Sequence, residues 1–228
     1  MSGYYININL KTDDAASVVK TVSAIFQAEG FASLGDESAA AVVEDEDKLP
    51  DGDDWYGVIV SSATKDGWVT VYVDDWQDSG LLAKRLSQSL SVPALEIWVA
   101  EDIHWGYTYY DKGEVQDRFA DDPSQVAETP DEIVLYCGQA DALTPILSIP
   151  ALRFDKILRE AQDSPGQFAG GPLDAVAQAT GLPFEHIFTG YDYFFDDDPD
   201  DYADDLENWP QFRHLAFRMP PGRETLAE

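Results

Sequence analysis

The sequence predicts an α+β protein in which two helices cover one face of a mainly antiparallel sheet. Three observations support this prediction: segments of alternating apolar residues, stretches with apolar residues three and four positions apart, and a hairpin turn between two strand-like segments. Up to residue 120 the expected order is strand, helix, two strands, helix and three strands. The simplest way to bury this order is an extended ferredoxin-like sandwich, followed by a small helical region.

The first strand and helix are expected before residue 31. Residues 4–10 (YYININL) alternate and are rich in residues that favour strands, while residues 12–30 open with Thr-Asp-Asp, a helix-capping sequence, and continue with apolar residues at helical spacing. Residues 36–54 contain Pro50 and Gly52 and few periodic apolar residues. This segment is therefore expected to be a loop.

A hairpin is expected next, because residues 55–64 and 68–76 are rich in Val, Tyr and Trp and are separated by an Asp-Gly turn at 66–67. An amphipathic helix should then begin at Asp78 or Ser79 and end before a proline. Strand-like sequences follow on both sides of a Lys-Gly turn. These segments complete the sheet in the prediction.

The chain is expected to have two parts, an α+β sandwich domain at 1–122 and a helical or mixed C-terminal region at 123–228 packed on it. Frequent prolines in the second part separate short helical stretches at 151–161 and 172–179. Residues 209–217 are the candidate for a last strand.

Acidic charge is the dominant feature of the composition. The chain has 44 acidic and 14 basic side chains, a formal charge of −30 and a pI near 4.1. Nucleic acids and anionic lipid surfaces are themselves densely negative, so direct nucleic-acid binding and membrane binding are not expected. A basic protein partner, a bound cation or a high-salt habitat would complement such a charge.

Two segments concentrate this charge. Residues 36–54 hold nine acids and one lysine, and residues 190–209 hold nine acids and no base, with aromatic residues in or beside both segments. Carboxylates beside aromatic rings suit a Lys- or Arg-rich partner through ion pairing and cation–π contact. In the alternative interpretation the aromatic rings belong to the core and the acids are solvated flanks. The expected partner-binding residues are Asp45, Glu46, Asp47, Asp53, Asp54, Trp55, Asp197, Asp201, Tyr202, Asp205 and Trp209.

Residues 196–207 (DDDPDDYADDLE) also resemble a calcium-binding loop. Acids stand at loop positions 1, 3, 5, 9 and 12, where an EF-hand places its oxygen ligands. Position 6 is Asp201 instead of the glycine that the turn requires, and Pro199 stiffens position 4. Loose binding of Ca²⁺ by clustered carboxylates is the alternative that follows, and no other cofactor is expected. The candidate metal ligands are Asp196, Asp198, Asp200, Asp204 and Glu207.

The sequence contains no specific catalytic signature. The three histidines, His104, His186 and His214, do not fall in a zinc-binding pattern, and the phosphate- and nucleotide-binding glycine motifs are missing. The single cysteine, Cys137, follows Ile-Val-Leu-Tyr and is expected to be a buried small apolar residue. One cysteine excludes an intramolecular disulfide. A binding protein is thus expected rather than an enzyme, with an acid-only active site as the alternative.

The compartment expected from the sequence is the cytoplasm. The first residues lack the basic flank and apolar core of a secretory signal, and no run of 18 apolar residues occurs. A soluble cytoplasmic protein is the interpretation that follows.

A resemblance adds one further expectation. The segment GWVTVYVDD, then LSQSLSVPALEIWVA, the hairpin GYTYYDKGEVQDRF and LDAVAQATGLP together resemble a pattern in uncharacterised bacterial proteins over about half of the chain. These motifs are structural and bring no functional residues with them. By acidity and size the chain is also similar to immunity proteins of bacterial toxin systems. The resemblance implies a role in covering a cognate toxin.

The leading functional hypothesis is therefore a non-enzymatic acidic protein that engages a basic partner, as an immunity protein or inhibitor, with DNA mimicry as one form of it. The alternative is a divalent-cation-binding or cation-dependent hydrolytic module that uses clustered carboxylates. Salt adaptation of a globular protein explains the charge without any specific partner.

Overall fold

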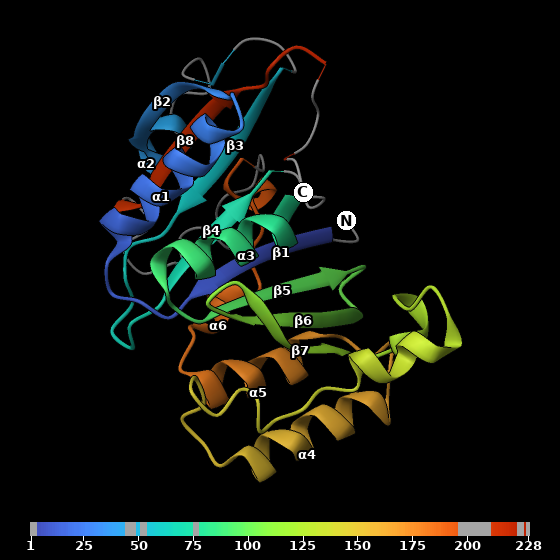
Figure 1. The fold of residues 1–228 in the computed structure, drawn as a ribbon. Coiled ribbons are helices and arrows are strands. Elements are labelled where there is room, and N and C mark those ends of the chain that lie inside the picture. The colour runs from blue at the N-terminus through green and yellow to red at the C-terminus, as the bar shows by residue number, and fades with distance from the viewer. Residues whose placement is uncertain are drawn as a thin grey trace.

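The computed structural model describes residues 4–43, 49–50, 54–74, 78–195, 211–222 and 226. Its described part has an open antiparallel sheet of eight strands in the order β2-β8-β3-β4-β1-β5-β6-β7, combined with six α-helices (Figure 1). The α+β class and the mainly antiparallel sheet predicted from the sequence are confirmed. The strands are β1 (Tyr4–Leu10), β2 (Ala32–Ser38), β3 (Trp55–Val60), β4 (Val69–Val73), β5 (Ala94–Ala100), β6 (His104–Asp111), β7 (Glu114–Ala120) and β8 (Arg213–Arg218). The helices are α1 (Ala15–Ala28), α2 (Ala39–Val43), α3 (Ser79–Leu90), α4 (Ala151–Gln162), α5 (Gly170–Thr180) and α6 (Phe184–Ile187), with 3-10 turns η3 (Pro123–Gln125), η4 (Pro130–Tyr136) and η5 (Asp192–Phe194).

The loop predicted at 36–54 was wrong over its first part. The chain there finishes β2 and forms the short helix α2. The sequence of β2, ASLGDES, has no apolar alternation, because β2 is the edge strand of the sheet and most of its side chains are exposed. Its place is secured by main-chain pairing with β8 instead of by burial.

The strand expected near residues 209–217 exists as β8, and it lies inside the sheet. It pairs antiparallel with β2 on one side and with β3 on the other, where Val58 faces Leu215. Its central residues from His214 to Phe217 are buried. The strand β8 thus joins the edge strand β2 to the rest of the sheet.

The division of the chain into two parts at residue 122 stays a prediction.

Buried side chains of α1 and α3 share one core with side chains from one face of the sheet. Asp14 caps α1 by accepting a hydrogen bond from the Ser17 backbone N–H, which satisfies one of the free donors at the helix start. The buried residues of α1 recur at helical spacing and end at Phe26, whose ring stacks on Phe217 of β8 at 4.5 Å between centroids. This packing joins the first helix to the last strand.

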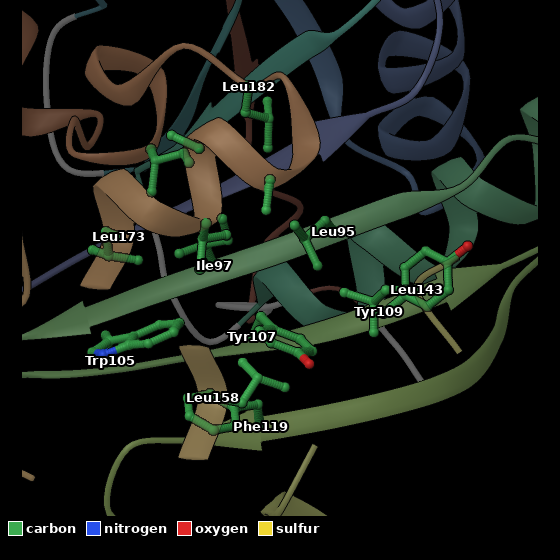
Figure 2. Close-up of a cluster of buried hydrophobic side chains, with 14 of the residues drawn as sticks. Leu95, Ile97, Trp105, Tyr107, Tyr109, Phe119, Leu143, Leu158, Leu173 and Leu182 are labelled. Carbon is green, nitrogen blue, oxygen red and sulfur yellow. The ribbon is translucent and has the colours of Figure 1, made fainter. Parts of the chain in front are cut away.

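The opposite face is covered by the helices that follow residue 150, so helices lie on both sides of the sheet. Figure 2 shows Leu173 and Leu182 against Leu95 and Ile97 of β5, and these side chains share one core with Phe154 of α4. In the described part of the chain, the sheet therefore has a large core on each face.

The exposure of Cys137 differs from the prediction. Cys137 is exposed, contrary to the burial expected from its apolar neighbours, because η4 leaves Val134 and Leu135 at the surface as well. Cys137 forms an isolated bridge to Phe119 of the edge strand β7, and its thiol donates to the Ile133 carbonyl oxygen at 3.5 Å.

In the described part of the chain, the helices are all too short or too polar to cross a membrane.

The orientation of α4 predicts different effects on stability for substitutions of two residues in this helix. Phe154 is fully buried and Leu152 is 82% exposed. We expect Phe154→Ala to lower the free energy of unfolding in urea by about 3–5 kcal/mol, because it leaves a cavity in the core, and Leu152→Ala to change it by less than about 0.5 kcal/mol. Equal effects of the two substitutions would contradict the described orientation of α4.

Candidate functional site

The described residues that flank the two acidic segments lie close together in space. Trp55 follows the first segment, and its ring centroid is 6.2 Å from that of His214 on β8. Phe195 lies in the second segment, directly before the acids that begin at Asp196, and its ring centroid is 5.9 Å from the same imidazole. Aromatic residues next to acids that are about 140 residues apart in sequence therefore meet at one side chain.

A small cluster of buried residues supports this arrangement, and we call it the anchor cluster. Its members come from α2, β3, β4, η5 and the residue before β8: Ala39, Ile59, Tyr72, Tyr191, Phe194 and Phe212, with Phe195 packed against them. The Ala39 N–H donates to the Phe212 carbonyl oxygen at 2.8 Å, which links the first segment to the residues after the second. The anchor cluster thus contains residues of both acidic segments.

Tyr191 closes the anchor cluster over the sheet. Its hydroxyl lies 2.8 Å from His214 Nε2, and burial lowers the pKa of His214 to about 4. The hydroxyl also sits directly over Gly57 of β3, at the place where a Cβ atom would be. Glycine is therefore required at this position for Tyr191 to reach His214.

The arginines of β8 are already paired with acids. Arg213 donates to Asp36 on β2 through Nε at 2.9 Å and through Nη2 at 2.6 Å, and Arg218 Nε lies 3.5 Å from Asp54 Oδ2. All four side chains are exposed, so each pair contributes little to stability. Each arginine neutralises one acid, so the two ion pairs remove only a small part of the negative charge of the acidic segments.

The predicted partner-binding residues are only partly described by the structure. Asp54 and Trp55 lie at the start of β3, and Trp55 is half-buried against His214. The neighbouring rings of Tyr56 and Phe194 are buried, as the alternative interpretation of the aromatic residues expects. The remaining predicted partner-binding residues lie outside the described part: Asp45, Glu46, Asp47, Asp53, Asp197, Asp201, Tyr202, Asp205 and Trp209.

The predicted calcium ligands, Asp196, Asp198, Asp200, Asp204 and Glu207, likewise all lie outside the described residues. The segment just before them, which resembles a strand in sequence, forms the 3-10 turn η5. Among the residues that the structure does describe, three or more His, Cys, Asp or Glu side chains never gather in a way that could hold a metal ion. The calcium hypothesis stays a prediction.

A groove of about 680 Å³ lies on the same face of the sheet as the anchor cluster. Its walls are residues 62–66, which connect β3 to β4, and residues of α5, of α6 and of the connection between these helices. This volume falls within the roughly 300–1,000 Å³ typical of small-molecule sites. His186 connects the groove to the anchor cluster, because its ring also packs against Phe212 at 5.7 Å.

A row of buried polar side chains runs from β1 to the groove. Asn7 Nδ2 donates to the carbonyl oxygens of Ile187 at 2.8 Å and Thr189 at 3.3 Å. Asn9 Nδ2 donates to Asn7 Oδ1 at 2.7 Å and to the Leu95 carbonyl oxygen at 3.2 Å. Since backbone carbonyls only accept, both amide groups have one allowed orientation.

The end of the row sets the tautomer of His186. Asn9 Oδ1 can only accept, so the Thr70 hydroxyl donates its one proton to it at 2.9 Å. Thr70 Oγ1 must then accept from His186 Nδ1, which lies 2.9 Å away. Burial lowers the pKa of His186 to about 4, so the ring is neutral at pH 7. His186 therefore carries its proton on Nδ1 and presents a bare lone pair on Nε2.

Two buried carboxyls elsewhere have structural partners. Glu96 accepts from the Ser79 hydroxyl at 2.7 Å and the Tyr110 hydroxyl at 3.3 Å, and Asp117 accepts from Tyr107 at 2.9 Å. Burial raises the pKa of both carboxyls. Neither lines the groove, so they are assigned to the cores.

The sequence analysis missed the polar row, although one signal for it was present. In YYININL the two asparagines stand two residues apart, which puts both on the same face of a strand between apolar residues of the other face. Two neighbouring asparagines on a buried strand need partners. The partners, however, lie some 60 to 180 residues away in the chain.

Comparison of the chain with models of known protein families, with curated proteins and with solved structures gave no match.

The two buried histidines predict a titration that can be measured directly. Both pKa values are lowered to about 4, so we expect the ring signals of His186 and His214 in NMR spectra to stay constant from pH 7.5 to about 5. The unfolded chain would take up these protons near pH 6.5. These histidines therefore lose their contribution to stability as pH falls from 6.5 to 4. A midpoint near 6.5 for either ring in the folded protein would contradict its described burial.

Proposed function

We propose that this protein is a non-enzymatic acidic binding protein that engages a basic protein partner, as an immunity protein or an inhibitor does. The observation that carries the proposal is the meeting of Trp55 and Phe195 at His214, because each of these residues is next to acids of one segment. A partner that contacts this place would meet acids from both segments at once.

Electrostatics supports a joint role for the two segments. The attraction of a charge for a partner falls off over a Debye length of about 8–10 Å in ordinary salt. Both rings lie within 6.2 Å of one imidazole, so the acids next to them in the chain, Asp54 and Asp196, adjoin residues separated by a distance comparable with that length. The fields of the two segments add there, and a basic patch on the partner gains association rate and specificity from the sum.

The anchor cluster gives the proposed surface a firm base. Tyr72, Phe194 and Phe212 are fully buried, and each ring lies within 6.4 Å of another ring of the cluster. A binding segment whose ends are held in place loses less conformational entropy when it meets a partner than one with free ends. We expect Trp55, which is half-buried at the rim of this cluster, to contribute an aromatic contact to the interface.

We also propose that the central strands of the sheet have a ferredoxin-like arrangement. The neighbouring strands β3-β4-β1-β5, with α1 after β1 and α3 after β4, follow the connection order of that fold. In this proposal β2, α2 and β8 extend one side of it, and β6 and β7 extend the other.

Four acids in the segments test the proposed function. We expect a variant with Asp47→Asn, Asp53→Asn, Asp197→Asn and Asp201→Asn to bind a basic protein from the native host at least about tenfold more weakly than the unmodified chain, with binding that also weakens as salt rises. The matched control removes four exposed acids elsewhere, through Glu114→Gln, Asp131→Asn, Asp141→Asn and Asp163→Asn.

Titration of the purified partner against the three proteins is the measurement. Equal losses in the variant and the control would show that diffuse charge, and not the two segments, is responsible, and the proposal would fail. It would also fail if no basic protein bound at low salt. If the partner is a DNA-binding protein and DNA displaces the chain from it, the interaction is nucleic-acid mimicry.

A further inference from the structure

The groove between the β3–β4 connection and helices α5 and α6 has no role in the function proposed above. We propose that it binds a guanidinium cation, with the His186 Nε2 lone pair accepting an N–H, the Phe184 ring providing a stacking face, and nearby carboxylates balancing the charge. This site is separate from the acidic segments, so it stands or fails independently of them.

His186 is the observation that points to a ligand. The residue is 4% exposed and lines the groove, so its small exposed part is what a ligand would meet. Nδ1 is occupied by Thr70, and Nε2 has no hydrogen-bond partner among the described residues. His186 Nε2 is not among the buried side-chain atoms without a partner in the described part of the chain, so solvent reaches it, and a ligand in the groove can supply its hydrogen-bond donor.

The hydrogen bonds of the polar row keep His186 Nε2 unprotonated, so it stays an acceptor. The chain of donors from His186 through Thr70 to Asn9 can run in only one direction, because it ends on backbone carbonyl oxygens. The proton of His186 cannot move to Nε2 without breaking the hydrogen bond to Thr70. A ligand therefore meets a fixed acceptor that needs no rearrangement, which favours binding of a group that only donates.

The charged residues of the groove favour a cation. Asp66, Asp174 and Glu185 line it, whereas Lys65 is the basic residue in the lining. Asp66 is held near the groove wall, because Lys11 donates to its carbonyl oxygen at 2.8 Å. An anionic ligand would face this excess of carboxylates, so a cation that donates hydrogen bonds is the better match.

The aromatic wall distinguishes guanidinium from ammonium. Phe184 lines the groove, and its ring is stacked on Phe188 at 5.3 Å between centroids, which holds its orientation. A guanidinium group is planar, weakly hydrated and has donors in one plane, so it can lie on a ring and donate sideways to Nε2 at the same time. An ammonium group is strongly hydrated and has no flat face to stack.

Calorimetric titration of the full chain with n-butylguanidinium, alongside n-pentylammonium as a probe of equal charge, tests the proposal. We expect one guanidinium site with a dissociation constant below about 1 mM and at least about fivefold weaker binding of the ammonium. The ring signals of His186 in NMR spectra should move with saturation. Equal binding of the two cations, absence of saturable binding, or unmoved His186 signals would overturn the proposal.

Variants locate the site. We expect Glu185→Gln, an exposed change in the groove, to weaken butylguanidinium binding about threefold through lost attraction, and Asp131→Asn, an exposed change on η4, to leave it unaltered. His186→Leu should weaken it about tenfold, because leucine has no hydrogen-bond acceptor. Equal effects of Glu185→Gln and Asp131→Asn would overturn the proposal even if the His186 variant failed to fold.

Two sources of the guanidinium group are separated by a third probe, the peptide acetyl-Gly-Arg-Gly-amide. Saturable binding of the peptide that moves the His186 signals would assign the groove to an arginine side chain of a protein. Binding of butylguanidinium without binding of the peptide would assign it to a small free guanidinium compound. Failure of all probes here would leave the test of the acidic segments untouched, because that test involves none of the groove residues.

Discussion

The insertion of β8 between β2 and β3 is the constraint on which the rest of the structure depends. Main-chain pairing on both sides of β8 attaches β2 to the sheet and brings the end of the chain back to the β3 region. The stacking of Phe217 on Phe26 fixes the same strand to the first helix. His214 on this strand is then the place where the flanks of both acidic segments meet. Without β8, the segments would have no common origin in the fold.

The two faces of β1 show how one strand serves both cores. Ile6, Ile8 and Leu10 point to the face covered by α1 and α3, while Asn7 and Asn9 point to the face of the groove. The asparagines attach the α6 region to the sheet through specific hydrogen bonds, where an apolar core would allow it to slide. This attachment sets the position of His186, and through its packing on Phe212 it connects the groove to the anchor cluster. The proposed partner surface and the proposed guanidinium site are therefore neighbours on one face.

Much of the sheet could be predicted because its strands are locally periodic. The strand at 4–10, the hairpin on either side of Asp66-Gly67 and the helices near 15 and 79 all carry signals within a few residues, and the structure has an element at each of these places. The strand β2 could not be predicted, since an edge strand that is mostly exposed has no apolar pattern to detect. The burial of the second face by the C-terminal helices is a tertiary property that depends on contacts between distant segments, such as Leu173 with the β5 side chains.

The candidate sites were harder to predict than the fold for a related reason. The acidic segments were evident from composition, but their common origin depends on the pairing of β8, which places Phe195 and Trp55 beside one residue. The polar row depends on His186 meeting Thr70, a contact 116 residues apart in sequence. The asparagine spacing in β1 signals that polar partners exist on one face, but it gives no information on which residues they are.

Hydrogen exchange of backbone amides tests the central role of β8 most directly. The paired amides of β8 lie within the sheet between two other strands, so the account predicts that they exchange as slowly as those of β1, within about tenfold in rate. Exchange of the β8 amides at the rate of an unstructured chain, while the amides of β1 and β5 stay protected, would contradict it.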